Sequence, residues 1–538
     1  MPSAIAVVTI AALVRLAVAA TVPLVPDETY YWEWSRHLAA GYFDHPGAIA
    51  FLVRAGTELA GVTPFGVRLG SVIAGWGASL CLVLLARRIG GDDAALRAAV
   101  IITCMPLAAA GLVLATPDAP LLLAVSAALL LLDHAVAAAP GSARSLGWWL
   151  AAGLALGAAM VSKYNAFLLP LGVLVALLLS AQLRRHLATP APYLAALVAL
   201  VAFAPVVAWN ASHGWISFRF QLSHGLAHGD GSALAREASL IGGQIGLVSP
   251  ILFALIVLMV GRALVRGTPR QTLLAVVAAT VFLFCCVSAL ARPAEANWQA
   301  IAYVPATVLL ATYSGGRIWR GWLGAACALG ATFVVLLYLQ AFSPFLPIAA
   351  GRDPTARGVG YDVLAASVAQ AASTAGRSVN AGHSTWIAAN RYQDASELAF
   401  HLAEHPLTFS LNIASRPNQY DLWPSFARHA RAGDDLVIAL PVPHSGADQV
   451  DPVIQVLRPH FGRTRLWSTV RITRGRDTLL VRRIWVLGDY RGIRKQGNYR
   501  GIRKQGNYRD QVTTGFRVQG AGIRNYLAGW DLSPRSPF

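Results

Sequence analysis

Charge is scarce in this sequence of 538 residues: only 13% of them are Asp, Glu, Lys or Arg, whereas 56% are apolar. Ordinary soluble domains are about 25% charged and about 45–50% apolar. The composition therefore excludes both a soluble single-domain enzyme and an intrinsically disordered chain. The formal net charge of +18 does not by itself indicate nucleic acid as a partner, and we expect none.

Lysine and cysteine are also rare. The three lysines are Lys163, Lys495 and Lys504, so arginine supplies almost every positive charge and Lys163 needs an explanation. All five cysteines lie in apolar runs, which excludes a disulfide framework in the polar part of the chain. The sequence has no compact His/Cys/Asp/Glu spacing typical of a metal site. We predict neither a metal nor a cofactor.

Long apolar runs are what the sequence has in abundance. A helix needs about 20 mostly apolar residues to span a membrane. Eleven stretches qualify, centred in 4–22, 66–86, 97–114, 118–136, 146–162, 165–181, 191–209, 241–261, 271–290, 298–314 and 321–341. The first has no basic residues before it and leads into more membrane sequence, which favours a retained span over a signal peptide. The sequence thus predicts a multi-pass α-helical membrane protein.

Arginines and carboxylates collect in alternate loops between these runs. Arginine fills one set, for example at 87–88, 184–185 and 262–270, and most of the carboxylates lie in the other set. Because short cytoplasmic loops are enriched in Arg and Lys, we expect the N-terminus in the cytoplasm. An odd number of spans then places the region after 342 in the periplasm of a bacterial inner membrane.

The sequence predicts three parts: a transmembrane body at 1–342, a small α/β domain at 343–488 and a basic tail at 489–538. Within the body, the first outside loop, 23–64, has aromatic residues at helical spacing, typical of helices that lie in the membrane interface. The tail repeats YRGIRKQGN without change at 490–498 and 499–507, and we expect it to be poorly ordered.

In 343–488 the sequence predicts helices that alternate with strands, a pattern that favours an α/β domain. The expected helices are 361–375, 396–402 and 452–458, the expected strands are 408–411 and 434–440, and a closing hairpin pairs 466–473 with 478–486.

The densest group of ionisable residues follows the first span, in PDETYYWEWSRHLAAGYFDHP at 26–46. Asp27 stands behind Pro23 and Pro26, where continuation of the helix is disfavoured. Partial desolvation at the interface should raise the pKa of Asp27 toward use as a general base. The alternative is a helix N-cap, worth about 1 kcal/mol. The sequence alone leaves both open.

Several stretches together resemble a known family. They are the 26–46 segment, ATPDAPLLL (115–123), GLALGAAMVSKYNAFLLPLGVL (153–174), PVVAWNASHGWISFRFQLSHG (205–225) and ANWQAIAY (296–303). They are similar to the bacterial C-type membrane glycosyltransferases that use polyprenyl-phosphate-sugar donors, relatives of the family 39 protein O-mannosyltransferases and of the lipid A aminoarabinose transferases. NRYQDASELAFHL (390–402) and PNQYDLW (417–423) resemble the periplasmic domain of one branch. The resemblance covers about residues 1–487.

The resemblance implies roles for the first loop. Asp27, with Glu28 beside it, matches an acidic residue that acts as the base or positions the acceptor. An acceptor hydroxyl attacks the anomeric carbon while the lipid phosphate leaves from the opposite face, so the configuration inverts. In the aminoarabinose transferases a Glu-Lys-Pro supplies a phosphate-binding lysine, and this chain has Asp44, His45 and a proline there. Histidine is largely neutral at pH 7, which weakens that role, although His45 can still donate a hydrogen bond.

Other cations are expected near the phosphate, because a leaving phosphate needs cationic or donor partners. Candidates are Lys163, Arg219 and His213. Alternatively, the Lys163 side chain extends to the lipid headgroups, and Arg219 and His213 anchor the chain at the membrane interface.

The remaining candidates, together with Asp44, hold the acceptor or are structural. Asp118 starts the fourth predicted span, where N-capping explains it equally well. Glu295 can help to hold the acceptor, and for Trp298 an aromatic membrane belt is the better explanation.

The sequence therefore predicts an inner-membrane glycosyltransferase with membrane lipids around it. It passes a sugar from a polyprenyl-phosphate donor to an envelope acceptor, whether lipid A or lipopolysaccharide, a polysaccharide, another lipid or a protein. No GxxxxGK[ST] loop is present, so the donor should be lipid-linked and not nucleotide-linked. A lipid-linked sugar flippase or transporter, which would need ionisable residues at mid-span, is one alternative. The others are a ligase or polymerase of glycans on polyprenyl diphosphate, and a non-catalytic relative in which His45 reflects lost phosphate binding.

Overall fold

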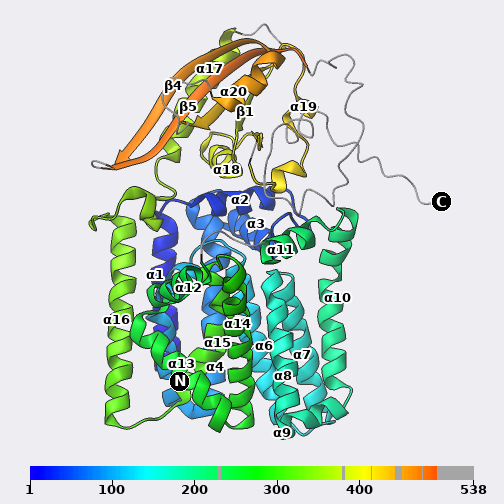
Figure 1. Cartoon of the computed structure of the whole chain (residues 1–538), viewed down its shortest axis with the longest axis vertical. Coiled ribbons are helices and arrows are strands. Elements are labelled where there is room, and N and C mark those ends of the chain that lie inside the picture. The colour runs from blue at the N-terminus through cyan, green and yellow to red at the C-terminus, as the bar shows by residue number, and fades with distance from the viewer. Residues whose placement is uncertain (227–231, 379–381, 414, 443–450, 475–476, 493–538) are drawn as a thin grey trace, which may run out of the picture. The chain divides into compact units, whose positions relative to one another are not determined.

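The computed structural model describes residues 1–226, 232–378, 382–413, 415–442, 451–474 and 477–492 (Figure 1). The chain divides into two compact units. Unit 1 is Met1–Val22 with Trp34–Leu346, and unit 2 is Pro23–Glu33 with Pro347–Phe538. The division after Leu346 lies close to the predicted boundary at 342. Most of the predicted tail, 493–538, lies outside the described residues.

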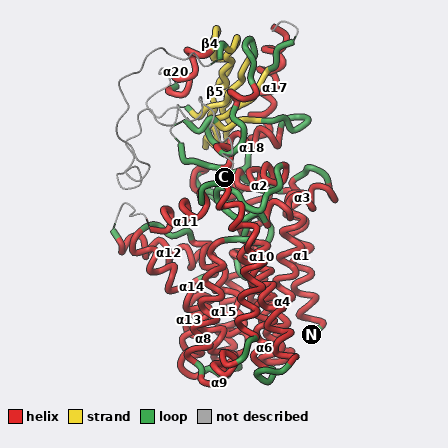
Figure 2. The backbone as a smooth tube through the Cα atoms, turned by 90° about the vertical axis from the view of Figure 1, so that its right-hand side faces the viewer, coloured by secondary structure: helices red, strands yellow, loops and turns green. Residues whose placement is uncertain are grey.

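Unit 1 is built from helices (Figure 2). They are α1 (Pro2–Thr21), α3 (Ala48–Ala60), α4 (Pro64–Thr103), α5 (Pro106–Gly111), α6 (Asp118–Ala137), α7 (Ala143–Met160), α8 (Leu168–Leu179), α9 (Ala181–Arg184), α10 (Ala191–Ser212), α11 (Ile216–Leu226), α12 (Ala233–Val248), α13 (Pro250–Arg266), α14 (Pro269–Ala291), α15 (Ala300–Thr312) and α16 (Arg317–Phe342), with the short 3-10 helices η1 (Tyr164–Phe167), η2 (Arg185–Ala188) and η3 (Ala296–Gln299). The long helices run side by side, with α3 and α11 at one end of the bundle and α9 at the other (Figure 1). We call the first of these the α3 end.

Each of the eleven predicted ranges contains helix, but fewer helices qualify as spans than predicted. Six described helices are long and apolar enough to cross a membrane, or up to eight if two sharply bent pairs each count as one span. One reason is that α4 covers two of the predicted spans as a single element of 40 residues, although a break at Gly91, with a φ of 78°, separates two helices inside it. Another is length, since α15 has 13 residues, below the about 20 that a span needs. The chain is a multi-span helical membrane protein, and the predicted number of spans stays a prediction.

Small residues let α7 and α10 approach closely. A Cβ on Gly153 would lie 2.3 Å from the carbonyl oxygen of Ala195, and one on Gly157 would lie 2.6 Å from the Cβ of Ala202. Glycines four residues apart on one helix face are typical of helix pairs in membranes. This contact fixes the end of α7, from which the chain runs to Lys163.

Unit 2 contains a five-stranded mixed sheet in the order β2-β1-β3-β5-β4. Its elements are α17 (Tyr361–Ser378), β1 (Thr385–Ala389), α18 (Tyr392–His401), β2 (Thr408–Ser410), α19 (Phe426–His429), β3 (Asp435–Pro441), α20 (Pro452–Leu457), β4 (Phe461–Arg474) and β5 (Asp477–Tyr490). Strands β2, β1 and β3 are parallel, and β5 and β4 add to them as an antiparallel hairpin. The predicted class, a helical membrane body with a small α/β domain, is therefore confirmed.

The segment between α1 and α3 contains buried aromatic residues. Helix α2 (Pro26–Arg36) carries the aromatic residues expected in the membrane interface, but Tyr30, Trp32 and Trp34 are each no more than 2% exposed. In unit 2 the Tyr30 ring lies 4.3 Å from that of Tyr392, and the Trp32 ring lies 5.2 Å from that of Phe400. These rings pack against protein partners, and the interfacial position predicted for this segment stays a prediction.

Candidate active site

Asp27 and Glu28 occupy the first turn of α2 and have different environments. The helix begins at Pro26, so Asp27 lies inside the first turn and not at the preceding capping position. Its side chain is exposed, so the protein does not supply the desolvation that the sequence predicts. Glu28 is fully buried, and its Oε2 accepts a hydrogen bond of 3.0 Å from the Val25 N–H. Glu28 thus caps the helix, while Asp27 presents a carboxylate at the positive end of the helix dipole.

The rest of unit 2 holds this first turn by hydrogen bonds. The Thr29 and Ser396 hydroxyls lie 3.1 Å apart, and the Gln419 N–H donates to the Tyr30 hydroxyl at 2.7 Å. Ser396 belongs to α18, in the NRYQDASELAFHL stretch, and Gln419 belongs to PNQYDLW. Three stretches that carry the family resemblance, two of them hundreds of residues from the first, therefore meet around the turn that bears Asp27.

Asp44 and His45 lie in a tight turn in unit 1. Gly41 pairs with Pro46 as an isolated β-bridge. Helix α11 holds this turn, because Ser217 donates to the Tyr42 carbonyl at 2.6 Å and Gln221 donates to the Asp44 carbonyl at 2.7 Å. Asp44 is buried and His45 is half-buried.

Tyr42 anchors the start of the same turn. Burial raises its pKa, so the hydroxyl stays protonated and donates to the carbonyls of Trp34 and His37 at 3.0 and 2.9 Å. The Trp34 and Tyr42 rings stack with their centroids 4.2 Å apart. This packing fixes the path of the chain from the end of α2 to Asp44.

Lys163 and Asp118 form a buried ion pair at the α3 end. The Lys163 ammonium donates to both carboxylate oxygens of Asp118, at 2.8 and 3.0 Å, and both side chains are buried. Asn297 donates to the same carboxylate at 3.1 Å. The sequence did not predict this pairing, which commits the charge of Lys163 to Asp118.

Arg219 and His213 are exposed in unit 1. His213 follows α10, where its ring stacks on that of Trp209 at 4.1 Å and its Nδ1 contacts the Trp209 carbonyl at 2.8 Å. Arg219 lies on α11, the helix that holds the turn bearing Asp44 and His45. The roles of Arg219 and His213 in donor binding stay predictions.

Glu295 and Trp298 lie in the loop between α14 and α15, which also contains Arg292, a residue that the sequence analysis did not predict for the site. Glu295 is exposed and Trp298 is half-buried. Arg292 is buried, and its guanidinium carbon lies 4.9 Å from the centroid of the Trp298 ring. Arg292 is one of several arginines in the carboxylate-rich loops, with Arg36, Arg54, Arg219 and Arg236, so no signal in the sequence singles it out.

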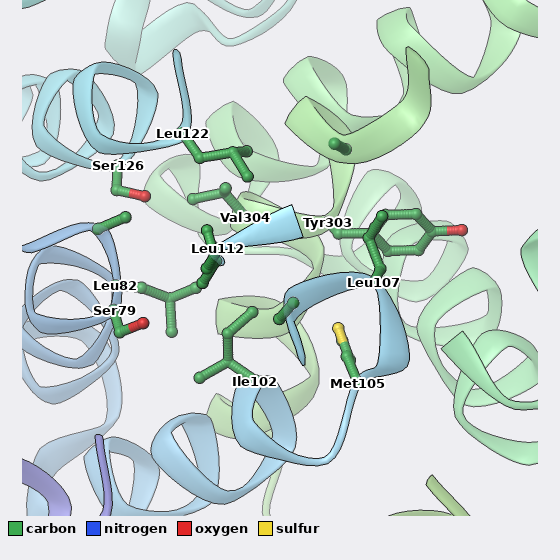
Figure 3. A pocket seen from close by; sticks show the side chains of 13 residues that line it. Ser79, Leu82, Ile102, Met105, Leu107, Leu112, Leu122, Ser126, Tyr303 and Val304 are labelled. Atoms are coloured by element: carbon green, nitrogen blue, oxygen red, sulfur yellow. The ribbon is translucent and has the colours of Figure 1, made fainter. Parts of the chain in front are cut away.

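A small apolar cavity lies deeper in unit 1, between α4, α5, α6 and α15 (Figure 3). Leu82, Leu112 and Leu122 contribute to its lining, with hydroxyls from Ser79 and Ser126. Its volume of about 30 Å³ has room for only one or two water-sized groups. It is therefore too small for a sugar or a prenyl unit and is not the substrate site.

Over the described ranges, no three or more His, Cys, Asp or Glu side chains form a group able to hold a metal ion. The expected absence of a metal stays a prediction.

Comparison with known proteins shows which family part of this chain resembles. The profile described as dolichyl-phosphate-mannose-protein mannosyltransferase matches residues 44–209. Residues 44–209 of this chain are therefore similar to that family. The predicted family resemblance is thereby confirmed, with the matched segment containing Asp44, His45, Asp118 and Lys163.

Two curated relatives of this chain are sugar transferases by name. A lipid A galacturonosyltransferase, RgtD, of Rhizobium johnstonii is 31% identical over 289 residues, 53% of this chain. An undecaprenyl phosphate-alpha-4-amino-4-deoxy-L-arabinose arabinosyl transferase of Pseudomonas aeruginosa is 35% identical over 167 residues, 28% of this chain. The matches span 59% and 30% of the lengths of these two relatives.

The likeness to solved structures covers more of the chain than the family match does. ArnT from Cupriavidus metallidurans in the apo state has a TM-score of 0.60 at 17% identity, over 89% of this chain and 97% of that one. The same protein bound to undecaprenyl phosphate gives the same TM-score at 18% identity. The likeness shows that this chain has the ArnT fold.

Proposed function

We propose that this chain transfers a sugar from a polyprenyl-phosphate-linked donor to a hydroxyl of an envelope acceptor, with inversion and with Asp27 as the general base. The observation that carries the proposal is the exposed Asp27 carboxylate in a capped first turn of α2, held by hydrogen bonds inside unit 2. The printed names of the two relatives, both sugar transferases, support the reaction class.

The proposed step balances as a single displacement. The acceptor oxygen forms a bond to the anomeric carbon, and its proton passes to the Asp27 carboxylate. The bond from that carbon to the phosphate oxygen breaks, and its electron pair remains on the phosphate. A positioned general base contributes about 10²–10⁴ in rate. The phosphate that leaves gains negative charge, which cationic donors stabilise.

The acceptor we favour is lipid A, because one relative is named for it. We place the reaction at the periplasmic face of the bacterial inner membrane, with the N-terminus in the cytoplasm and unit 2 in the periplasm. The N-terminal ammonium pairs with Asp92, which also pairs with Arg87. This groups the N-terminus with an arginine from a loop that the charge bias assigns to the cytoplasm.

Separate donors test the proposed reaction. The purified full chain in lipid nanodiscs is given lipid A with an undecaprenyl phosphate monosaccharide, or with an undecaprenyl diphosphate oligosaccharide. We expect mass spectrometry to show the addition of one sugar from the first donor only, with inverted anomeric configuration by NMR. Transfer from the diphosphate donor alone would instead support a ligase. Movement of the donor across vesicles without any transfer would support a transporter.

A further inference from the structure

The arginines of unit 1 differ in what their guanidinium groups contact. Arg68 donates to the carbonyl of Val22, just after α1, at 2.6 Å. Arg236 donates to the carbonyl of Ala289 near the end of α14 at 3.0 Å. Both arginines thus satisfy carbonyl groups at helix ends, which explains their presence structurally.

Among the residues that the structure describes, Arg292 has no comparable hydrogen bond, although the nearby Glu295 carboxylate interacts with it electrostatically. Arg292 follows α14 directly, and its side chain belongs to a residue only 6% exposed. Within the described part of the chain its Nε has no hydrogen-bond partner. The ring of Trp298 lies under the guanidinium at 4.9 Å. A cation–π contact offsets only part of the cost of burying a guanidinium, so the unused donor favours an anionic ligand.

The neighbours of Arg292 place it beside the polar cluster at the α3 end. The Trp298 carbonyl accepts from the Asn165 side chain at 3.4 Å. Asn297, the preceding residue, contacts the Asp118 carboxylate that already neutralises Lys163. The expected phosphate ligand Lys163 is therefore occupied, whereas Arg292 nearby retains unused hydrogen-bonding capacity.

We propose that Arg292 binds the phosphate of the lipid-linked donor, with Trp298 supporting the guanidinium from below. This inference rests on the proposed function. The donor phosphodiester carries one negative charge, and the phosphate gains a second when its bond to the sugar breaks. The planar fork of arginine can donate two parallel hydrogen bonds to phosphate oxygens. The contact therefore strengthens as the leaving group forms.

Binding of undecaprenyl phosphate and of uncharged undecaprenol to the full chain in nanodiscs tests this assignment. We expect Arg292→Gln to weaken undecaprenyl phosphate binding at least about tenfold, the value of a charged hydrogen bond, and to leave undecaprenol binding unchanged. Arg292→Lys keeps the positive charge and controls for misfolding. It should weaken undecaprenyl phosphate binding less than Arg292→Gln does. Arg262→Gln is the matched control, because Arg262 also lies over an aromatic ring, that of Tyr313 at 5.0 Å, and should bind as wild type does.

Three results would overturn the assignment. Equal loss for both lipids would make Arg292 a structural residue, and unchanged binding in both Arg292 variants would exclude it from the site. Competition by phosphatidylglycerol as strong as by undecaprenyl phosphate would identify a general headgroup site. In all three cases a wild-type protein that still transfers sugar would leave the proposed function standing, whereas a wild type that neither binds undecaprenyl phosphate nor transfers sugar would refute the function itself.

Discussion

Replacing Lys163 by methionine separates a structural role from phosphate binding. The ammonium makes hydrogen bonds of 2.8 and 3.0 Å to Asp118, and the two side chains are 9% and 10% exposed. Lys163→Met leaves the carboxylate buried without its cation, which typically costs about 3–5 kcal/mol. Unfolding of the purified protein in mixed micelles, titrated with SDS, measures this cost. The double variant Asp118→Asn/Lys163→Met contains neither charge and should recover at least about 2 kcal/mol as coupling energy.

The exposed pair between Arg54 and Glu58 is the matched control. Their side chains are 47% and 60% exposed, so Arg54→Met should cost no more than about 1 kcal/mol. If Lys163→Met costs no more than this control and abolishes undecaprenyl phosphate binding, the argument from burial is refuted. Lys163 would then be the phosphate ligand that the sequence predicted.

Three further predictions concern packing and protonation. Tyr30→Phe removes the acceptor of the buried Gln419 N–H, so we expect a loss of about 1–3 kcal/mol and faster hydrogen exchange in the first turn of α2. Gly157→Leu places a side chain against α10, where even an added Cβ would lie 3.1 Å from the Ala199 carbonyl oxygen. We expect it to lower the unfolding free energy by about 1–3 kcal/mol, measured in the same SDS titration. Burial acts to raise the pKa of Asp434, but three N–H donors at 2.8–2.9 Å hold that pKa below its usual range. Stability that Asp434 contributes is therefore present above about pH 4 and lost as the pH falls further, and hydrogen exchange of β3 should lose this acid dependence in Asp434→Asn.

Local patterns predicted most of the secondary structure. The hairpin of β4 and β5, strands β2 and β3 and helices α17 and α20 lie where hydrophobic periodicity placed them. Strand β1, Thr385–Ala389, was missed, because a short strand between two others and covered on both faces shows no alternation. Fewer long apolar helices are found than spans were predicted, because two predicted ranges share α4 and because α15 is short.

The site was predictable as a set of residues but not as a set of contacts. The acidic cluster after α1 and the family stretches indicated Asp27, Asp118 and Lys163. The pairing of Lys163 with Asp118 joins residues 45 positions apart, and no local pattern encodes it. The same holds for the contact of Tyr30 with Gln419. It is one of the contacts that join Pro23–Glu33 to unit 2, whereas the sequence analysis had placed this segment in the membrane body.

The most direct test of the account is the turnover of Asp27→Asn beside Asp362→Asn. Each aspartate is exposed and is the second residue of a helix, α2 or α17, so the two changes remove the same charge from equivalent positions. With Asp27 as the base, turnover in Asp27→Asn falls by about 10²–10⁴ while undecaprenyl phosphate binding is retained, and Asp362→Asn stays near wild type. Near wild-type turnover in Asp27→Asn would contradict the account.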